Sequence, residues 1–161
     1  MLSHSDSREK GTLISKILVA HDGSEYADKA LFWALDIAEK YGAKAEVINV
    51  IPLSGLFSTG MYPLETAAPL FEPSMQRSRD AAHRMVAGVL EKAKFSKPSV
   101  TVSSKILEGK PAEKIVEAAK EGKFDLIVMG SRGLGAVREF FLGSVTGRVA
   151  DTATCPVLIV K

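Results

Sequence analysis

Cysteine is almost absent from this 161-residue sequence, which contains only Cys155. A single cysteine excludes an internal disulfide and any zinc site built from Cys-x-x-Cys pairs. Long apolar runs are absent too, because none approaches the roughly 18 residues of a membrane-spanning helix. Residues 1–11 are polar and lack the apolar stretch of a signal peptide. We therefore expect a cytoplasmic protein without membrane contact, in which residues 1–11 form a disordered tail.

An excess of charge of one sign is also lacking. The 21 Lys and Arg residues outnumber the 19 Asp and Glu residues by only two, which is too few to indicate a nucleic-acid partner. The three histidines, His4, His21 and His83, show no metal-ligand spacing. Hydrophobic residues make up 46% of the chain and charged residues 25%, as in ordinary globular domains. We expect one domain over residues 12–161.

Continuous apolar runs, typical of strands buried on both faces, alternate with segments of helical spacing. The expected strands cover residues 17–20, 45–51, 100–107, 124–129 and 156–160, and the expected helices begin after Ser24, near Pro73, at Pro111 and at Ser144. Strands joined by helices run parallel, under helices on both faces. Placing the first strand beside the fourth predicts an α/β fold, a doubly wound five-stranded sheet of order 3-2-1-4-5.

Residues 52–72 form a long connection with no clear period, yet they include several large apolar side chains. Structureless connections of this length are uncommon and are usually functional or disordered. One interpretation is a lid or a partner surface, and the other is a loop that lies over the second helix. The sequence leaves both open.

Two strand ends are expected to meet where the strand order reverses, which is where open α/β sheets bind ligands. Asp22 directly follows the first strand, and residues 130–144 (GSRGLGAVREFFLGS) follow the fourth. Gly133 and Gly135 permit a positive φ and close approach of a ligand to the backbone. This pattern predicts a phosphate site.

The start of the last helix strengthens that prediction. The free N–H groups of a helix that opens at Gly143-Ser144 favour an anion. Ser144 can cap the helix or donate its hydroxyl to a phosphate oxygen. Arg132 and Arg138 supply positive charge that offsets a polyphosphate.

Gly130, Gly133, Gly143 and Ser144 together form a Gly-x2-Gly-x9-Gly-Ser pattern, which follows an IVMG strand and is preceded by VAHDGS. Over about Lys16–Lys161 the sequence resembles the ATP-binding branch of the universal stress protein family. The resemblance implies a three-layer Rossmann-like fold of the adenine nucleotide alpha hydrolase type. It also implies a nucleotide-dependent module for stress response or signalling.

The resemblance implies ATP, ADP or AMP as the ligand, with Mg²⁺ or Mn²⁺ bound to the phosphates. The phosphates would meet the backbone of the motif, Asp22 would meet the ribose or the metal ion, and Val50 would present its backbone to the adenine. The residues that the resemblance assigns to the nucleotide are Ala20, Asp22, Val50, Gly109, Met129, Gly130, Gly133, Gly143, Ser144 and Val145. The family also implies a homodimer through the last strand, residues 157–160, and a protein partner that the sequence does not identify.

Other readings of single residues stay open. Asp22 can instead cap the first helix within an Asp-Gly-Ser turn. We interpret His21 as a structural residue or one that supports the site from behind, and Cys155 as a small filler of the core. Asp125 begins the fourth strand at the edge far from the motif, so we assign it a structural role.

The sequence contains the parts of a binding site but not those of a fast enzyme. It lacks the GxxxxGK[ST] lysine and a second carboxylate at a strand end, so we expect at most slow ATP hydrolysis. An ATPase or a nucleotidyl-transfer enzyme on the same scaffold is the alternative. A ligand-free interaction module is a further one, and the intact glycine pattern argues against it.

Overall fold

The computed structural model describes residues 13–53, 64–134 and 142–161, without the side chains of residues 64–70. Strands and helices alternate along it: β1 (Lys16–Ala20), α1 (Glu25–Tyr41), β2 (Lys44–Pro52), α2 (Leu64–Ser96), β3 (Val102–Gly109), α3 (Pro111–Glu121), β4 (Leu126–Gly130), α4 (Ser144–Thr152) and β5 (Val157–Val160). The strands form one parallel sheet in the order β3-β2-β1-β4-β5. The predicted fold and strand order are confirmed, and most strand bounds shift by one or two residues.

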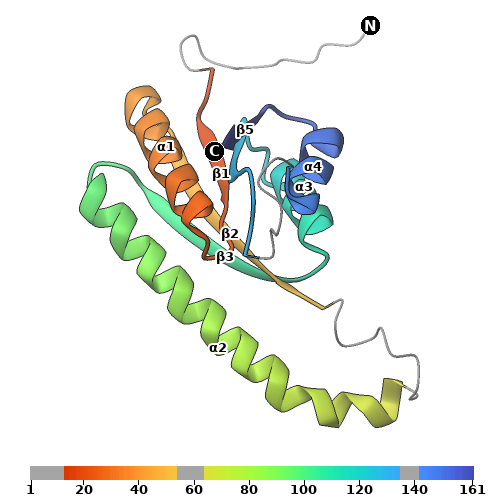
Figure 1. Cartoon of the computed structure of the whole chain (residues 1–161). Helices are drawn as coiled ribbons and strands as arrows, with labels where there is room; N and C mark the ends of the chain where they lie inside the picture. The colour runs from red at the N-terminus through yellow and green to blue at the C-terminus, as the bar shows by residue number, and fades with distance from the viewer. Residues whose placement is uncertain (1–12, 54–63, 135–141) are drawn as a thin grey trace, which may run out of the picture.

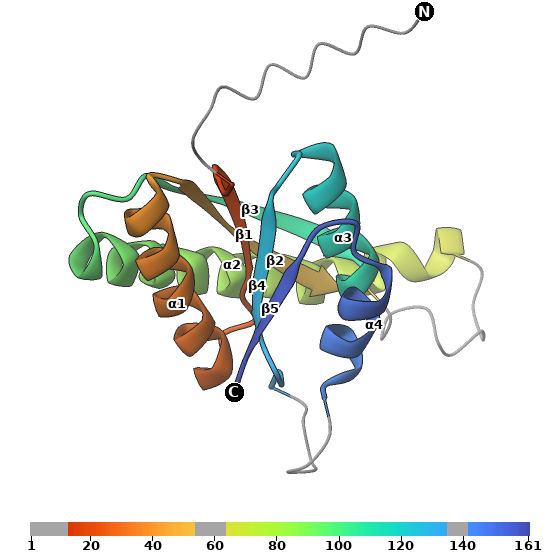
Figure 2. The same cartoon turned by 90° about the horizontal axis from the view of Figure 1, so that it is seen from above.

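Helices cover both faces of the sheet (Figures 1 and 2). Helices α1 and α2 pack on one face against side chains such as Ile17, Val19 and Val128. Helices α3 and α4 pack on the other against Leu18 and Ile127. Because β1 and β4 are covered on both sides, all of their apolar residues are buried. This is the reason why their sequences read as continuous apolar runs.

Local signals place α1 so that its first turn lies beside the end of β1. The Ser24 side chain caps α1 by accepting a hydrogen bond from the Ala27 N–H at 3.2 Å. Gly42 ends the helix with φ +67°, a conformation that suits glycine. The turn between Ala20 and Ser24 is thereby held at the carboxyl edge of the sheet.

Helix α2 differs from the prediction, because it begins at Leu64 rather than near Pro73. Residues 64–72 are therefore helical, and the connection between β2 and α2 is shorter than expected. The two interpretations concerned residues 52–72 as a connection without secondary structure; residues 64–72 are not such a connection, and residues 54–63 lie outside the described part of the chain. Prolines normally disfavour a helix interior, and Pro69 and Pro73 made this segment look irregular in the sequence.

Tertiary contacts explain why α2 continues past its prolines. Met75 and Ala82 are buried against Ile51 of β2, with Leu53 and Ile106 beside them. The first turns of α2 project beyond the rest of the fold in both views (Figures 1 and 2). Among the described residues, no helix, α2 included, is both long and apolar enough to cross a membrane.

Candidate functional site

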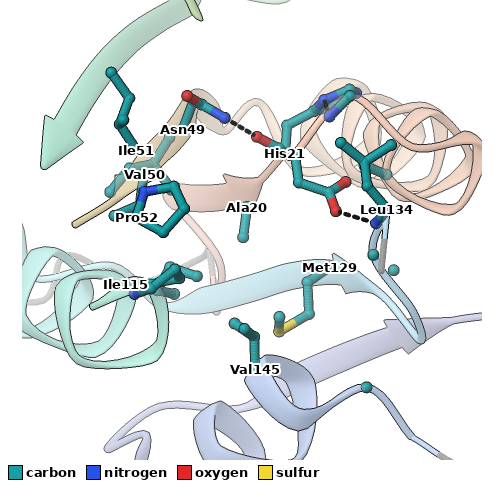
Figure 3. A pocket seen from close by; sticks show the side chains of 18 of the residues that line it. Ala20, His21, Asn49, Val50, Ile51, Pro52, Ile115, Met129, Leu134 and Val145 are labelled. Carbon is teal, nitrogen blue, oxygen red and sulfur yellow. Dashed lines mark hydrogen bonds between the residues drawn. The ribbon is translucent and has the colours of Figure 1, made fainter. Parts of the chain in front are cut away.

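A pocket of about 800 Å³ opens at the carboxyl ends of the strands. Its lining comes from the ends of β1, β2 and β4, the starts of α3 and α4, and one side of α2. Figure 3 shows Ile115, Met129 and Val145 on the α3 and α4 side, and His21, Asn49 and Ile51 on the opposite side of the strand ends. The register aligns Ala20 with Ile48 and with Met129, so the residues that follow these positions gather at one edge.

Most of the predicted site residues line this one pocket. Gly109 is not among its lining residues: it ends β3, and the Lys114 side chain lies against it. Gly135 and Arg138 fall outside the described residues. The predicted residues that line the pocket are Ala20, Asp22, Val50, Met129, Gly130, Arg132, Gly133, Gly143, Ser144 and Val145.

Two glycines of the motif lie in close contact with their surroundings, and at Gly130 the contact is with backbone. A Cβ at Gly130 would lie 2.7 Å from the Tyr26 Cβ and 2.8 Å from the Tyr26 carbonyl carbon. Both distances are too short, so glycine is what lets β4 end directly against α1. Gly133 does not adopt the positive φ that the sequence suggested, and a Cβ there would collide with the Asp22 carboxylate. Both glycines thus bring the loop after β4 against α1 and Asp22.

Gly143 is different, because nothing in its described surroundings needs a glycine. A Cβ at Gly143 would meet its nearest described neighbours, the Arg132 Cα and the Ser131 oxygen, at an ordinary 3.5 Å. Its φ of −58° suits any residue. Gly143 occupies the N-cap position of α4, so Ser144 is the first helical residue rather than the cap. The N–H groups of the first turn of α4 therefore begin at the pocket without carbonyl partners inside the helix.

The Asp22 carboxylate bridges the ends of β1 and β4. Its Oδ1 accepts a hydrogen bond from the Ser24 N–H at 3.0 Å, and its Oδ2 accepts one from the Leu134 N–H at 3.0 Å. The second bond is drawn in Figure 3. The first of these bonds forms the Asp-Gly-Ser turn that was the alternative interpretation of Asp22. The same side chain lines the pocket, so the turn and a role toward a ligand are compatible.

Arg132 lies against Tyr26 of α1. Its Nη1 donates a hydrogen bond to the Tyr26 hydroxyl at 2.9 Å, and its guanidinium lies 5.4 Å from the centre of the Tyr26 ring. The Tyr26 contact holds the only described cationic side chain that lines the pocket. Arg132 therefore sets the positive charge of the described site.

His21 is buried at the back of the pocket, with 3% of its surface exposed. Its Nε2 lies 3.1 Å from the Asp28 Oδ1, and its Nδ1 accepts a hydrogen bond from the Gly23 N–H at 3.1 Å. Burial lowers the pKa of His21 more than the neighbouring Asp28 and Asp22 carboxylates raise it. The neutral imidazole is therefore favoured, as expected for a side chain that supports the site from behind.

The comparison with protein families decides where the chain belongs. A sequence profile described as the universal stress protein family matches residues 14–161. The chain belongs to the universal stress protein family. It is similar to a universal stress protein of Thermus aquaticus, with 35% identity over 149 residues that cover 92% of this chain and 100% of the relative.

Solved structures give the same family and fold. Universal stress protein UspA from Lactobacillus plantarum superposes with a TM-score of 0.79 and 25% identity, covering 92% of this chain and 98% of that one. A universal stress protein from Archaeoglobus fulgidus, solved in complex with dAMP, has a TM-score of 0.66 and 22% identity, covering 93% of this chain and 100% of that one. At that identity the second likeness concerns the fold alone.

Several pocket residues of this universal stress protein were missed by reasoning from sequence. Asn49 is a buried polar residue in an otherwise apolar strand, a signal that was available, and its Nδ2 donates a hydrogen bond to the His21 carbonyl at 2.8 Å. Thr146 donates a hydrogen bond to the Gly130 carbonyl at 2.9 Å and fixes the end of β4. The sequence of α2 contains no pattern that would indicate a pocket wall. The residues that α2 contributes to the lining are Ser78, Ala81, Ala82 and Met85, at ordinary helical positions.

Asp125 and Cys155, for which the sequence predicted structural roles, are not among the lining residues of the pocket. Asp125 accepts hydrogen bonds from the Ser15 N–H and hydroxyl and from the Lys16 N–H, at the opposite edge of the sheet. Cys155 is half-buried against the α3 and α4 core, and burial raises the pKa of its thiol, which disfavours the reactive thiolate. No group of three or more His, Cys, Asp or Glu side chains that could hold a metal ion occurs in the described ranges.

Proposed function

We propose that this universal stress protein binds ATP, ADP or AMP in the pocket at the ends of β1 and β4 and acts as a nucleotide-dependent module in stress response or signalling. One observation carries the proposal: the glycine motif and the first turn of α4 line the same pocket. Unpaired N–H groups at a helix N-terminus favour a phosphate. The dAMP complex of the Archaeoglobus fulgidus protein supports the proposal to the extent that this fold can hold an adenine nucleotide.

Each part of the pocket suits a different part of the nucleotide. The phosphates would lie against the backbone of Gly130, Gly133 and Gly143, with Ser144 and Val145 beside them. The apolar walls made by Met129, Ile115 and Val50 offer room for a flat base, and the Val50 backbone would present its polar groups to the adenine. Asp22 would face the ribose or the metal ion.

A metal ion would be held mainly by the nucleotide. Asp22 is the only carboxylate among the described lining residues, and it already accepts two backbone hydrogen bonds. Mg²⁺ keeps most of its waters and takes one or two carboxylates plus phosphates, so a single Asp22 fits that arrangement. Neither a lysine nor a second carboxylate lies in the described lining, which supports the proposal of at most slow hydrolysis.

The sharpest test uses Gly143→Ala with Gly147→Ala as its matched control. A methyl group fits at both positions in the described structure, because Gly147 has nothing within 4 Å. Only Gly143 lines the pocket. We expect Gly143→Ala to lower the ATP affinity about tenfold or more, since a close backbone–phosphate contact of about 1.4 kcal/mol or more is lost. Gly147→Ala should leave the affinity unchanged, and isothermal titration calorimetry with and without Mg²⁺ measures both.

Mass spectrometry of small molecules released from freshly purified protein tests the same proposal independently. We expect an adenine nucleotide. A wild-type protein that carries no nucleotide and gives no heat with ATP, ADP or AMP would overturn the proposal. Many turnovers of ATP per minute, lost in Gly143→Ala, would favour the ATPase alternative.

We also propose that the protein forms a homodimer through β5. This strand is the last in the sheet order, so one side of its backbone has no partner strand among the described residues. Residues 157–159 are only half-buried although they are apolar. An apolar open edge is a liability unless another chain covers it, and a second copy related by a two-fold axis would do so.

A further inference from the structure

All four polar atoms of His21 form hydrogen bonds. The backbone N–H donates to the Ile48 carbonyl at 2.9 Å, and the backbone carbonyl accepts from the Asn49 amide. The ring contacts Gly23 through Nδ1 and Asp28 through Nε2. These partners lie on β2, on α1 and in the turn after β1, so the residue directly before Asp22 is fixed from three directions.

The ring contacts require one particular tautomer. The Gly23 N–H can only donate, so Nδ1 must be unprotonated. The proton of the neutral ring then resides on Nε2, and this N–H donates a hydrogen bond to the Asp28 carboxylate. Neither a hydrocarbon nor a donor group at the Nδ1 position would hold the Gly23 amide. The contact therefore depends on an acceptor at that point and not merely on a side chain of the right volume.

The Gly23 amide controls where Asp22 points. Gly23 has φ +90°, a conformation that glycine adopts readily and other residues avoid, so the turn depends on a glycine at this position. The peptide that carries the Gly23 N–H is the one that follows Asp22, and the same turn is closed by the bond from Ser24 to the Asp22 Oδ1. Because the Nδ1 contact fixes the Gly23 peptide, it also fixes where the turn places the Ser24 N–H, and that N–H orients the Asp22 carboxylate.

The contacts of the His21 ring extend through Asp28 to α2. Lys92 donates hydrogen bonds to both Asp28 oxygens, at 2.8 and 3.0 Å. Lys92 thus holds Asp28 in place, and Asp28 holds the Nε2 side of the ring. The orientation of the imidazole is set by α1 and α2 together, outside the pocket.

We infer that His21 is a positioning residue of the pocket, which holds the Gly23 amide through an unprotonated Nδ1 and so aims the Asp22 carboxylate at the ligand. This inference rests on the proposed nucleotide function. The ring nitrogens of His21 contact Asp28 and the turn at Gly23, so the effect of His21 passes through the arrangement of Asp22.

The first test needs no ligand. Nuclear magnetic resonance of ¹⁵N-labelled wild-type protein at neutral pH distinguishes the two neutral tautomers of His21 by the shifts of its ring nitrogens. We expect the tautomer protonated at Nε2. A ring protonated at Nδ1 would overturn the inference, because it cannot accept the Gly23 N–H.

The second test separates the two ring nitrogens by substitution. His21→Asn places an amide oxygen near the position of Nδ1, and His21→Gln places its amide group near the position of Nε2. His83, an exposed residue of α2 outside the pocket lining, provides the matched control His83→Asn. Affinity for ATP with Mg²⁺ is measured by calorimetry, and the melting temperature of each variant is measured alongside it.

We expect His21→Asn to bind ATP within about threefold of wild type, and His21→Gln to bind about tenfold more weakly, which is the effect of one lost buried hydrogen bond. His83→Asn should match wild type. Equal affinities for the two His21 variants, or affinities that merely follow their melting temperatures, would overturn the inference. Wild-type protein that binds no nucleotide would instead overturn the proposed function, and the tautomer would still be measurable.

Discussion

The residues of the glycine motif have different physical tasks. Gly130 and Gly133 are fixed by what surrounds them, because a side chain at either would collide with Tyr26 or with the Asp22 carboxylate. Gly143 has space around it in the described structure. Loss of nucleotide binding in a Gly130 variant would therefore not separate a damaged fold from a damaged site. Gly143 is the motif position where a substitution reports on the ligand.

Asp22 is expected to contribute to both the fold and the site. Asp22→Asn can keep the bond from Ser24 through its amide oxygen, but the amide nitrogen that replaces Oδ2 cannot accept the Leu134 N–H. We expect the free energy of unfolding to fall by about 1 kcal/mol or less, since the contact is exposed. We also expect the increase in ATP affinity caused by Mg²⁺ to shrink. Calorimetry in Mg²⁺ and in a chelator measures this, and an unchanged dependence on Mg²⁺ would show that Asp22 does not face the metal ion.

For single residues, the sequence predicted which of them lie at the pocket better than it predicted their side-chain contacts. Asp22, Gly130 and Ser144 were placed correctly because strand ends and helix starts are visible as changes of period. The contact between Arg132 and Tyr26, and the hydrogen bond from Asn49 to His21, join residues far apart in the chain. Such contacts depend on how the helices pack on the sheet, which a single sequence does not specify.

Helix α2 is the element whose extent the sequence predicted least well. Its first half combines two prolines with a weak apolar pattern, while its attachment comes from elsewhere. Arg79 donates hydrogen bonds to Glu108 at the end of β3, at 2.6 Å, and to Glu72, two turns earlier on the same face of α2, at 2.9 Å. With the small cluster around Met75, these ion pairs hold the part of α2 that provides a wall of the pocket.

Arg79→Met should loosen this half of α2 while the rest of the fold stays intact. We expect faster amide hydrogen exchange over residues 71–82 and little change over residues 86–96, which pack on the main core. The matched control is Arg77→Met, because Arg77 lies two positions earlier on the same helix and is exposed. Exchange measured by mass spectrometry checks both, and equal effects of the two variants would show that the Glu108 contact does not anchor the helix.

The same ion pair predicts a dependence on pH. The Arg79 hydrogen bond lowers the pKa of Glu108 below its ordinary 4.5, more than its slight burial raises it. Its stabilising effect is thus complete above about pH 4.5 and is lost as the pH falls through the lower value in the folded protein. In wild type, exchange over residues 71–82 should therefore quicken below about pH 4.5, after correction for intrinsic rates. In Arg79→Met this extra acceleration should be absent, and its persistence would point to another carboxylate.

For the molecule as a whole, the alternation of strand and helix determined the fold. Four crossover connections of one hand leave few possible sheets, and a ligand edge follows from the strand order. The alternation predicted a parallel sheet, and placing the first strand beside the fourth gave the order 3-2-1-4-5, which the structure confirms. A single sequence does not specify what covers the open edge at β5, and the proposed dimer follows from family resemblance and from that exposed edge.

The β5 edge can be tested without disturbing the sheet. The Pro156 and Val160 carbonyls accept hydrogen bonds from the Ile127 and Ser131 N–H groups, so the backbone groups of residues 156 and 160 face β4. Successive residues of a strand direct their backbone groups to alternate sides, so the Ile159 N–H points to the open side. Ile159→Pro removes that donor, whereas Ile159→Ala shortens the same side chain and keeps it. Light scattering at micromolar concentration should show a dimer for wild type and Ile159→Ala and a monomer for Ile159→Pro. A monomeric wild type would overturn the homodimer.

The bond between Asp22 and Leu134 joins residues 112 positions apart, and the helix that completes the pocket comes later still, at Ser144. During synthesis, therefore, the pocket is unfinished until α4 has left the ribosome. With the proposed nucleotide binding, the ligand would stabilise only folded molecules that contain α4, since binding favours whichever state contains the site. Chains that are truncated before α4 would gain none of that protection and would be open to degradation.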